Sequence, residues 1–246
     1  TTYYFTCGGP GHWSEEYSFR TIGLDQKVKI IFGGDSRTWH DGEFPYDEIE
    51  GPVFPDARRA VSDYSARENP DFVIFDGDMV NTGYNEEQWE AWLEDIPGRL
   101  VTEDGRLIPI VAEIGNHDIG SLKSLDIYRD MRDYDYYRGI FALPGNELWY
   151  TLDFPGVRII VLANAGGVGW IDEYMHSGER YESEVLQQVD FLEDQLASAE
   201  QEWVFVTHHV SICSGYGLDP GDGGWSMIDN WVPLFEEYGV QMDLSS

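Results

Sequence analysis

The stretch Phe72-Val73-Ile74-Phe75-Asp76-Gly77-Asp78 decides the fold of this chain. Four apolar residues in a row fit a buried β-strand. Gly77 allows a tight turn directly after this strand, and Asp78 is the first side chain beyond the turn. Ligands of α/β sheets bind beyond the carboxyl ends of the strands, so Asp78 is predicted to face a ligand. The alternative is that Gly-Asp is only turn chemistry. Asp76 is interpreted as structural.

Three other predicted strands end in polar groups of the same kind. These groups are Asp35-Ser36-Arg37 after Val28–Phe32, Asn116-His117-Asp118 after Ile108–Val111, and His208-His209 after Trp203–Val206. Carboxylate, amide and imidazole side chains that reach one rim from separate strands are typical of a metal site.

The string Gly115–Asp118 is the most specific of these groups. Asn116 offers a neutral carbonyl oxygen to a metal, and His117 can protonate a leaving group. Asp118 can hold the imidazole in one tautomer, which sets the nitrogen that faces a substrate. The alternative is a polar loop with a surface histidine, and the Gly-Asp pair of the preceding strand favours the functional interpretation.

The remaining candidates are a histidine pair and an arginine. His208 and His209 point to opposite sides of their strand, so one is predicted to be a ligand and the other a structural donor. Asp35 is a natural first ligand. Arg37 is always charged and cannot bind a metal, but its guanidinium can offer a bidentate fork to a phosphate. The alternative for Arg37 is an ion pair with a nearby carboxylate.

Strands and helices alternate from Val28 onward, which predicts a layered α/β domain. Helices are predicted at 56–67, 86–94, about 183–199 with Ser183 as N-cap, and 227–238. A hairpin is predicted at 149–162 around Pro155-Gly156, and a last strand begins at 240–244. Residues 1–22 differ, because they alternate around the turn Gly8–Gly11 and predict a β-hairpin, which two strands alone cannot hold together in water.

The composition is strongly acidic. The 246 residues carry 15 Lys and Arg against 46 Asp and Glu, a formal net charge of −31. Such a field repels nucleic acids and anionic membranes, so no nucleic-acid partner is expected. No apolar run reaches the length of a membrane-spanning helix, and no signal peptide is apparent in residues 1–20. Cys7 and Cys213 allow one disulfide at most, and both are expected to be free thiols.

An excess of carboxylates with few lysines is typical of halophilic proteins; the alternative is an acidic secreted protein. If the origin is halophilic, the melting temperature should rise between low and molar KCl, because salt screens the repulsion among the carboxylates. A melting temperature that stays constant over this range would count against a halophilic origin.

The order Gly-Asp at 34–35, Gly-Asp at 77–78, Gly-Asn-His-Asp at 115–118 and Val-Thr-His-His at 206–209 resembles the calcineurin-like metallophosphoesterase superfamily. The resemblance runs from about Val28 to Ser246 and implies a four-layer α/β sandwich of two central sheets flanked by helices. Residues 1–22 resemble the end of the fibronectin-III-like domain that precedes purple acid phosphatases and their bacterial and archaeal relatives. Two parts are therefore expected: a residual hairpin at 1–22 and a metallophosphoesterase domain at 23–246.

The resemblance also implies a site and an activity. Two metal ions would be held by Asp35, Asp78, Asn116 and His208, with Asp78 between them. They would clamp a phosphate ester for in-line attack by water. His117 would be the general acid, supported by Asp118, and Arg37 would contact the phosphate. An extracellular or periplasmic location is expected from the same relatives.

Three departures from the pattern of the superfamily limit the expectation. Many members carry Asp-x-His where this chain has Asp35-Ser36-Arg37, and purple acid phosphatases carry a tyrosine ligand where this chain has Asn81. A purple iron–tyrosinate site is therefore not expected, and the metals stay open among Mn, Fe and Zn. The Gly-His-x-His motif of the superfamily, expected after Tyr238-Gly239-Val240, is not found before Ser246, so both ends are interpreted as truncated.

The sequence thus predicts a metal-dependent phosphatase or phosphodiesterase. The alternative is a metal- or phosphate-binding domain of the same fold without catalysis, which the departures at the first and last motifs would suit.

Overall fold

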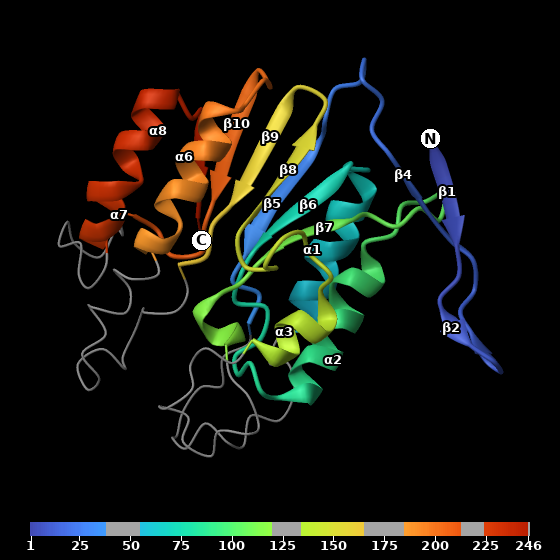
Figure 1. Ribbon diagram of the computed structural model, residues 1–246. Helices are drawn as coiled ribbons and strands as arrows, with labels where there is room; N and C mark the ends of the chain where they lie inside the picture. The colour runs from blue at the N-terminus through green and yellow to red at the C-terminus, as the bar shows by residue number, and fades with distance from the viewer. Residues whose placement is uncertain (38–54, 120–133, 165–184, 213–223, 246) are drawn as a thin grey trace.

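Two β-sheets packed face to face form the centre of the molecule (Figure 1). The computed structural model describes residues 1–37, 55–119, 134–164, 185–212 and 224–245. The first sheet has the order β5-β6-β7, all parallel, with β5 at Ile30–Gly34, β6 at Phe72–Asp76 and β7 at Ile110–Glu113. Because the strands run in parallel, their carboxyl ends meet at one edge, where the polar groups predicted from the sequence follow.

The second sheet has the order β11-β10-β9-β8. Its strands are β8 (Tyr150–Phe154), β9 (Val157–Val161), β10 (Trp203–Thr207) and β11 (Met242–Leu244). β8 and β9 form the predicted antiparallel hairpin, whereas β10 runs parallel to both β9 and β11. Contacts of Thr207 with Glu113 and of His209 with the Asp76 carbonyl place the carboxyl end of β10 beside those of β6 and β7.

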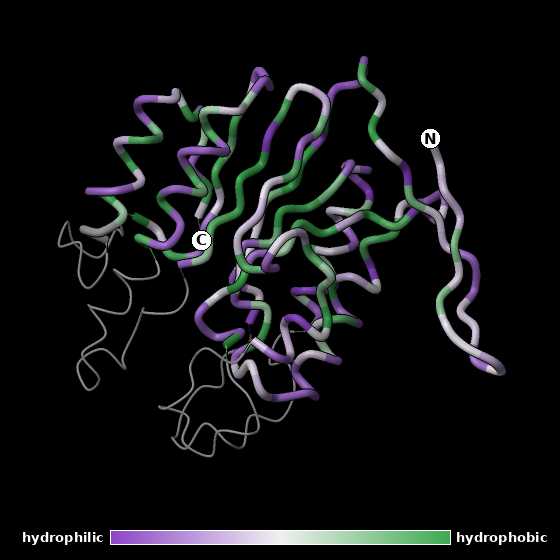
Figure 2. The backbone as a smooth tube through the Cα atoms, viewed as in Figure 1, coloured by the Kyte–Doolittle hydropathy of each residue, from purple (hydrophilic) through white to green (hydrophobic). Residues whose placement is uncertain are grey.

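Helices cover the outer faces of both sheets. Residues of α1 (Pro55–Arg67), α2 (Glu86–Asp95) and α3 (Asp135–Ile140) share an apolar cluster with β6 and β7, while α6 (Val189–Ala197), α7 (Gly224–Asn230) and α8 (Val232–Tyr238) cover β9 and β10. A third cluster, which includes Ile74 and Ile159, fills the space between the sheets. Figure 2 shows the strands as the most apolar part of the chain. The fold is the four-layer α/β sandwich expected from the sequence.

The elements lie close to their predicted positions, with two differences. The helix predicted at 227–238 is two helices, and Pro233 lies in the first turn of the second, where its missing N–H is not needed. Helix α3 was not predicted, since it lies in an irregular stretch rich in Tyr, Arg and Asp. Ser183, the predicted N-cap, lies outside the described residues, as do Cys213 and much of the long loops. Cys7 is a free, exposed thiol, as predicted.

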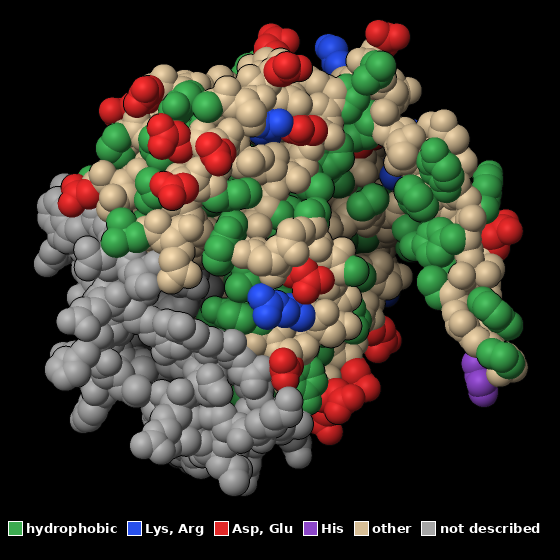
Figure 3. Space-filling model, in the orientation of Figure 1, with side chains coloured by type: hydrophobic (Ala, Val, Ile, Leu, Met, Phe, Trp, Pro, Cys, Tyr) green, Lys and Arg blue, Asp and Glu red, His purple; other side chains and the backbone are tan. Residues whose placement is uncertain are grey.

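Residues 1–22 form the predicted hairpin. β1 (Thr2–Phe5) pairs with β4 (Tyr17–Arg20), and β2 (Gly8–Gly9) pairs with β3 (His12–Trp13) near the turn. The hairpin leans away from the sandwich and carries apolar side chains on its surface (Figures 1 and 3). It is joined to the domain by the hydrogen bond from the Leu107 N–H to the Ser18 carbonyl and by an ion pair of Arg20 with Asp71. The origin of this hairpin in a fibronectin-III-like domain stays a prediction.

The surface in view is acidic, with many carboxylates and few basic side chains (Figure 3). Among the described helices, none combines the length and the apolar character needed to cross a membrane.

A pair of carboxyl groups is buried between the sheets just below the polar edge. Asp76 of β6 and Glu113 of β7 are register partners, and both are inaccessible to solvent. The Thr207 hydroxyl donates to Glu113 Oε2 across the sandwich at 2.9 Å. Burial and the neighbouring charge of Asp76 raise the pKa of Glu113 well above its ordinary value. The raised pKa favours a proton shared between the two carboxyl groups, and the burial of Asp76 agrees with its interpretation as a structural residue.

This pair predicts how the stability depends on pH. The raised pKa of folded Glu113 gives stability that is complete below its unfolded pKa and is lost as the pH rises toward the folded pKa. In Glu113→Gln the amide donates to Asp76 at every pH, so this loss disappears. We expect the variant to be more stable than wild type by about 1–2 kcal/mol at pH 8, or roughly 2–8 °C in Tm, and equal at pH 4.

Thermal melts at both pH values test this expectation. Glu68→Gln, which changes an exposed carboxylate paired with Lys29, is the matched control. The difference in Tm between Glu113→Gln and wild type is compared at the two pH values. If the variant gains less at pH 8 than at pH 4, Asp76 and Glu113 do not share a proton.

Candidate metal centre

The loops after β6 and β7 approach each other so closely that only glycine fits between them. A Cβ on Gly115 would lie 2.1 Å from the backbone nitrogen of Asp78, and one on Gly77 would lie 2.7 Å from the Gly115 Cα. Gly77 also has a positive φ of 69°. Asp35 and Asp78 have positive φ values of 50° and 51°, an uncommon conformation that aspartate tolerates better than most residues. The two Gly-Asp strings thus turn both carboxylates toward one point.

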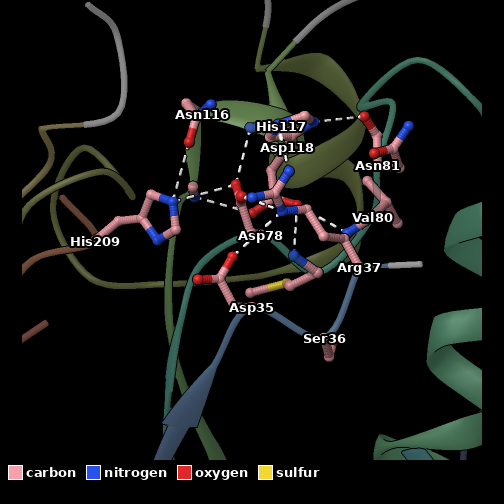
Figure 4. Close-up of polar contacts among 12 residues, drawn as sticks. Asp35, Ser36, Arg37, Asp78, Val80, Asn81, Asn116, His117, Asp118 and His209 are labelled. Carbon is pink, nitrogen blue, oxygen red and sulfur yellow. Dashed lines mark hydrogen bonds and ion pairs between the residues drawn. The ribbon is translucent and has the colours of Figure 1, made fainter. Parts of the chain in front are cut away.

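Asp78 lies at the centre of the site (Figure 4). Its Oδ1 accepts a hydrogen bond from the His117 backbone N–H at 2.9 Å and lies 3.2 Å from His209 Nε2. Its Oδ2 lies 2.7 Å from Arg37 Nε. Burial alone would raise the pKa of Asp78, but the hydrogen bond to His209 and the positive charges around it lower this pKa to about 2. Asp78 is therefore an ionised, buried carboxylate with two distinct sides.

His209, and not His208, faces Asp78. Its Nε2 lies 3.0 Å from Asn116 Oδ1, and its Nδ1 donates to the Asp76 carbonyl at 2.9 Å. Burial favours the neutral imidazole, but Asp78 outweighs it and raises the pKa of His209 to about 9. Metal-binding histidines commonly donate their second nitrogen to a backbone carbonyl in this way.

The prediction that His208 joins the site is wrong. His208 is inaccessible to solvent and lies on the opposite side of the strand, against Trp231 of the helix layer. Its Nε2 contacts Asp243 Oδ1 at 2.8 Å, and its Nδ1 donates to the Val210 carbonyl. The side-chain alternation of β10 explains why His209 and not His208 reaches the site. Thr207 points between the sheets to Glu113, and His209, two residues later, lies on that same side.

The loop after β5 brings Asp35 and Arg37 to the site. The Asp35 N–H donates to the Gly77 carbonyl and the Arg37 N–H to the Asp78 carbonyl, which ties this loop to the next one. Between them, Ser36 accepts a hydrogen bond from Trp92 Nε1 of α2 at 3.0 Å, a contact that the sequence did not indicate. One ligand atom each of Asp35, Asp78 and His209 lie within 4.8 Å of one another.

His117 lies beside this cluster, and its contacts differ from those predicted. Its Nδ1 donates to the Asn81 carbonyl at 2.8 Å, and its Nε2 accepts from Arg37 Nη1 at 2.7 Å. The imidazole is therefore held as the neutral tautomer with its proton on Nδ1. Burial and the nearby positive charges lower the pKa of His117, although Asp78 opposes them.

Asp118 does not hold the imidazole, contrary to the prediction. Its carboxylate accepts hydrogen bonds from the backbone N–H groups of Met79, Val80 and Gly115 and so fastens the two loops together. Burial and the charge of Asp78 raise the pKa of Asp118 to about 7. The Asn81 backbone carbonyl takes the role expected of Asp118, and a backbone atom leaves no sign in the sequence.

These residues fit a metal ion. Asp78 Oδ1, Asn116 Oδ1 and His209 Nε2 provide a carboxylate, an amide oxygen and an imidazole around one point, which is a donor set for Mn, Fe or Zn.

The model of the calcineurin-like phosphoesterase family matches residues 39–242. The chain belongs to the calcineurin-like phosphoesterase family. This membership agrees with the resemblance carried by the four strand-end motifs. No curated protein matches the sequence of this phosphoesterase chain.

Three solved structures share the phosphoesterase fold. A purple acid phosphatase from yellow lupin (Lupinus luteus) seeds has a TM-score of 0.64 and 18% identity over 95% of this chain and 40% of its own. PhoD has a TM-score of 0.63 and 13% identity over 99% of this chain and 56% of its own. GAP50, described as the anchor in the inner membrane complex of Plasmodium, has a TM-score of 0.53 and 13% identity over 89% of this chain and 65% of its own. The chain thus spans between two fifths and two thirds of these proteins.

Proposed function

We propose that this phosphoesterase chain hydrolyses phosphate esters with a divalent or trivalent metal ion bound at Asp78, Asn116 and His209. The observation that carries the proposal is the convergence of these side chains at the polar edge, with the Nδ1 of His209 anchored on a backbone carbonyl. The family of the chain supports the reaction class. Monoester and diester substrates both fit the proposal.

The metal ion would be Mn, Fe or Zn, and when bound it acts as a Lewis acid on the phosphoryl oxygens. The resemblance implies a dinuclear centre. Asp78, Asn116 and His209 support one ion, and Asp35 with Asp78 marks the place of the other.

The chain's own residues bind and orient the phosphate. The Arg37 side chain is largely buried in the site, and its guanidinium is a donor fork next to the metal-binding edge. It would hold phosphoryl oxygens and stabilise the charge that develops on them. A general-acid role of His117 requires a proton on Nε2, the atom that accepts from Arg37 Nη1 in this structure.

The proposal is tested with an aryl phosphate monoester and an aryl phosphodiester. The protein is treated with a chelator, dialysed, and assayed before and after Mn, Fe or Zn is restored. We expect no hydrolysis without metal and hydrolysis of at least one ester with it. Tight metal binding without hydrolysis of either ester would instead support the non-catalytic alternative.

That alternative, a metal- or phosphate-binding domain, has one observation in its favour. The hydrogen bond between Arg37 and His117 occupies the nitrogen that a general acid needs. An extracytoplasmic location and a halophilic origin also stay proposals.

A further inference from the structure

We propose that the guanidinium of Arg37 takes the place of one of the two metal ions, so that the chain binds a single ion at Asp78, Asn116 and His209. This inference rests on the proposed function, because it concerns the charge arrangement of the same site. The number of metal ions that the chain binds tests this inference, so no measurement of catalysis is needed.

The first step of the argument is the position of Arg37. Its Nε lies 3.2 Å from Asp35 Oδ1 and 2.7 Å from Asp78 Oδ2, so it bridges the two carboxylates at the ends of β5 and β6 (Figure 4). A metal ion shared by these two carboxylates would need the same space.

The second step is the fixation of this side chain. Arg37 Nη1 donates to His117 Nε2, and the imidazole is held in turn by the Asn81 carbonyl. The backbone of Arg37 is tied to the Asp78 carbonyl, and its neighbour Ser36 is tied to Trp92 of α2. A side chain held at both ends in this way is part of the built site and not a surface arginine that happens to lie near an acid.

The third step is the charge. Arginine keeps its positive charge at every physiological pH, so it cannot give way to a cation by losing a proton, as His209 can. One divalent ion and the guanidinium together offset all but one of the negative charges of Asp35, Asp78 and an incoming phosphate dianion. A second divalent ion next to the guanidinium would face strong repulsion in this buried place.

The two carboxylate oxygens of Asp78 therefore have different partners. Its Oδ1 side provides ligand atoms for a metal together with Asn116 and His209, while its Oδ2 side, with Asp35, already has a cation that belongs to the protein. Asp35 accordingly serves as a positioning residue for Arg37 and not as a ligand of the bound ion.

The test counts metal ions. Protein freed of metal is titrated with Mn²⁺, the bound ions per chain are measured by elemental analysis, and their coupling is followed by electron paramagnetic resonance. We expect one ion per wild-type chain with the spectrum of an isolated Mn²⁺. Arg37→His, which removes the guanidinium and adds an imidazole beside Asp35, should bind two ions that are magnetically coupled.

Two further variants complete the test. Arg99→His, which replaces an exposed arginine paired with Asp63, is the matched control and should still bind one ion. Asp35→Asn in the wild-type background should change the affinity for that ion less than tenfold, which keeps the test valid if Arg37→His does not fold.

The outcomes separate this inference from the proposed function. Two ions in wild type, one ion in folded Arg37→His, or a hundredfold loss of affinity in Asp35→Asn would overturn the inference and leave metal-dependent hydrolysis standing. No Mn²⁺ bound by wild type under any condition would overturn the metal centre itself.

Discussion

Replacing Asp78 by asparagine is expected to weaken Mn²⁺ binding by more than about 100-fold, because even residues that only support a ligand contribute 10–100-fold to metal affinity. Asparagine keeps the size of the side chain and tolerates the positive φ of 51° at this position. The variant therefore removes the negative charge between Arg37 and His209 with little change of shape.

The measurement is calorimetric titration of Mn²⁺ into metal-free protein. Asp153→Asn, which changes an ion pair with Arg158 at a distance from the metal centre, is the control and should bind Mn²⁺ as wild type does. An Asp78→Asn variant with wild-type affinity would place the ion elsewhere.

The largest expected loss of stability follows from Asp95→Ala. Asp95 is fully buried at the end of α2, where its carboxylate pairs with Arg58 and Arg59 of α1. Removal of the carboxylate leaves two guanidinium groups facing each other without a counter-charge. We expect a loss of about 3–5 kcal/mol in the free energy of unfolding, or roughly 6–20 °C in Tm.

The control is an ion pair that joins α1 to the turn that follows α2. Asp63 of α1 pairs with Arg99 of the 3-10 turn η2 (Pro97–Arg99), but both side chains are partly exposed, so Asp63→Ala should change Tm little. Equal losses in the two variants would mean that the charge of Asp95 is not what holds α1 against α2. Because α2 also holds Ser36 through Trp92, Asp95→Ala should weaken the loop that carries Arg37 as well.

The fold could be predicted largely from the sequence, because the apolar strand runs and the Gly-Asp turns are local signals. Asp78, Asn116 and Asp35 reach the predicted edge for the same reason: each follows a parallel strand of one sheet. The split of the last predicted helix into α7 and α8 was marked only by Pro233, which fits the first turn of a new helix and not the interior of a continuous one.

The choice between His208 and His209 could not be made from the sequence. All four residues from Trp203 to Val206 are apolar, so the pattern does not tell which side of β10 faces the other sheet. Only the packing shows it: Val204 and Val206 contact the helix layer, whereas Phe205 lies between the sheets. The contact of Arg37 with two carboxylates and an imidazole is likewise a product of three loops, and the sequence of no single loop indicates it.

The most direct test of the proposed metal-dependent hydrolysis is the rate of aryl phosphate hydrolysis by His209→Ala in saturating Mn²⁺. His12→Ala, on the exposed hairpin, is the control for the loss of an imidazole, and circular dichroism confirms that both variants are folded. We predict that His209→Ala is slower than wild type by more than about 100-fold, as expected for a lost metal ligand, and that His12→Ala is unchanged. A folded His209→Ala variant with the wild-type rate would contradict the account.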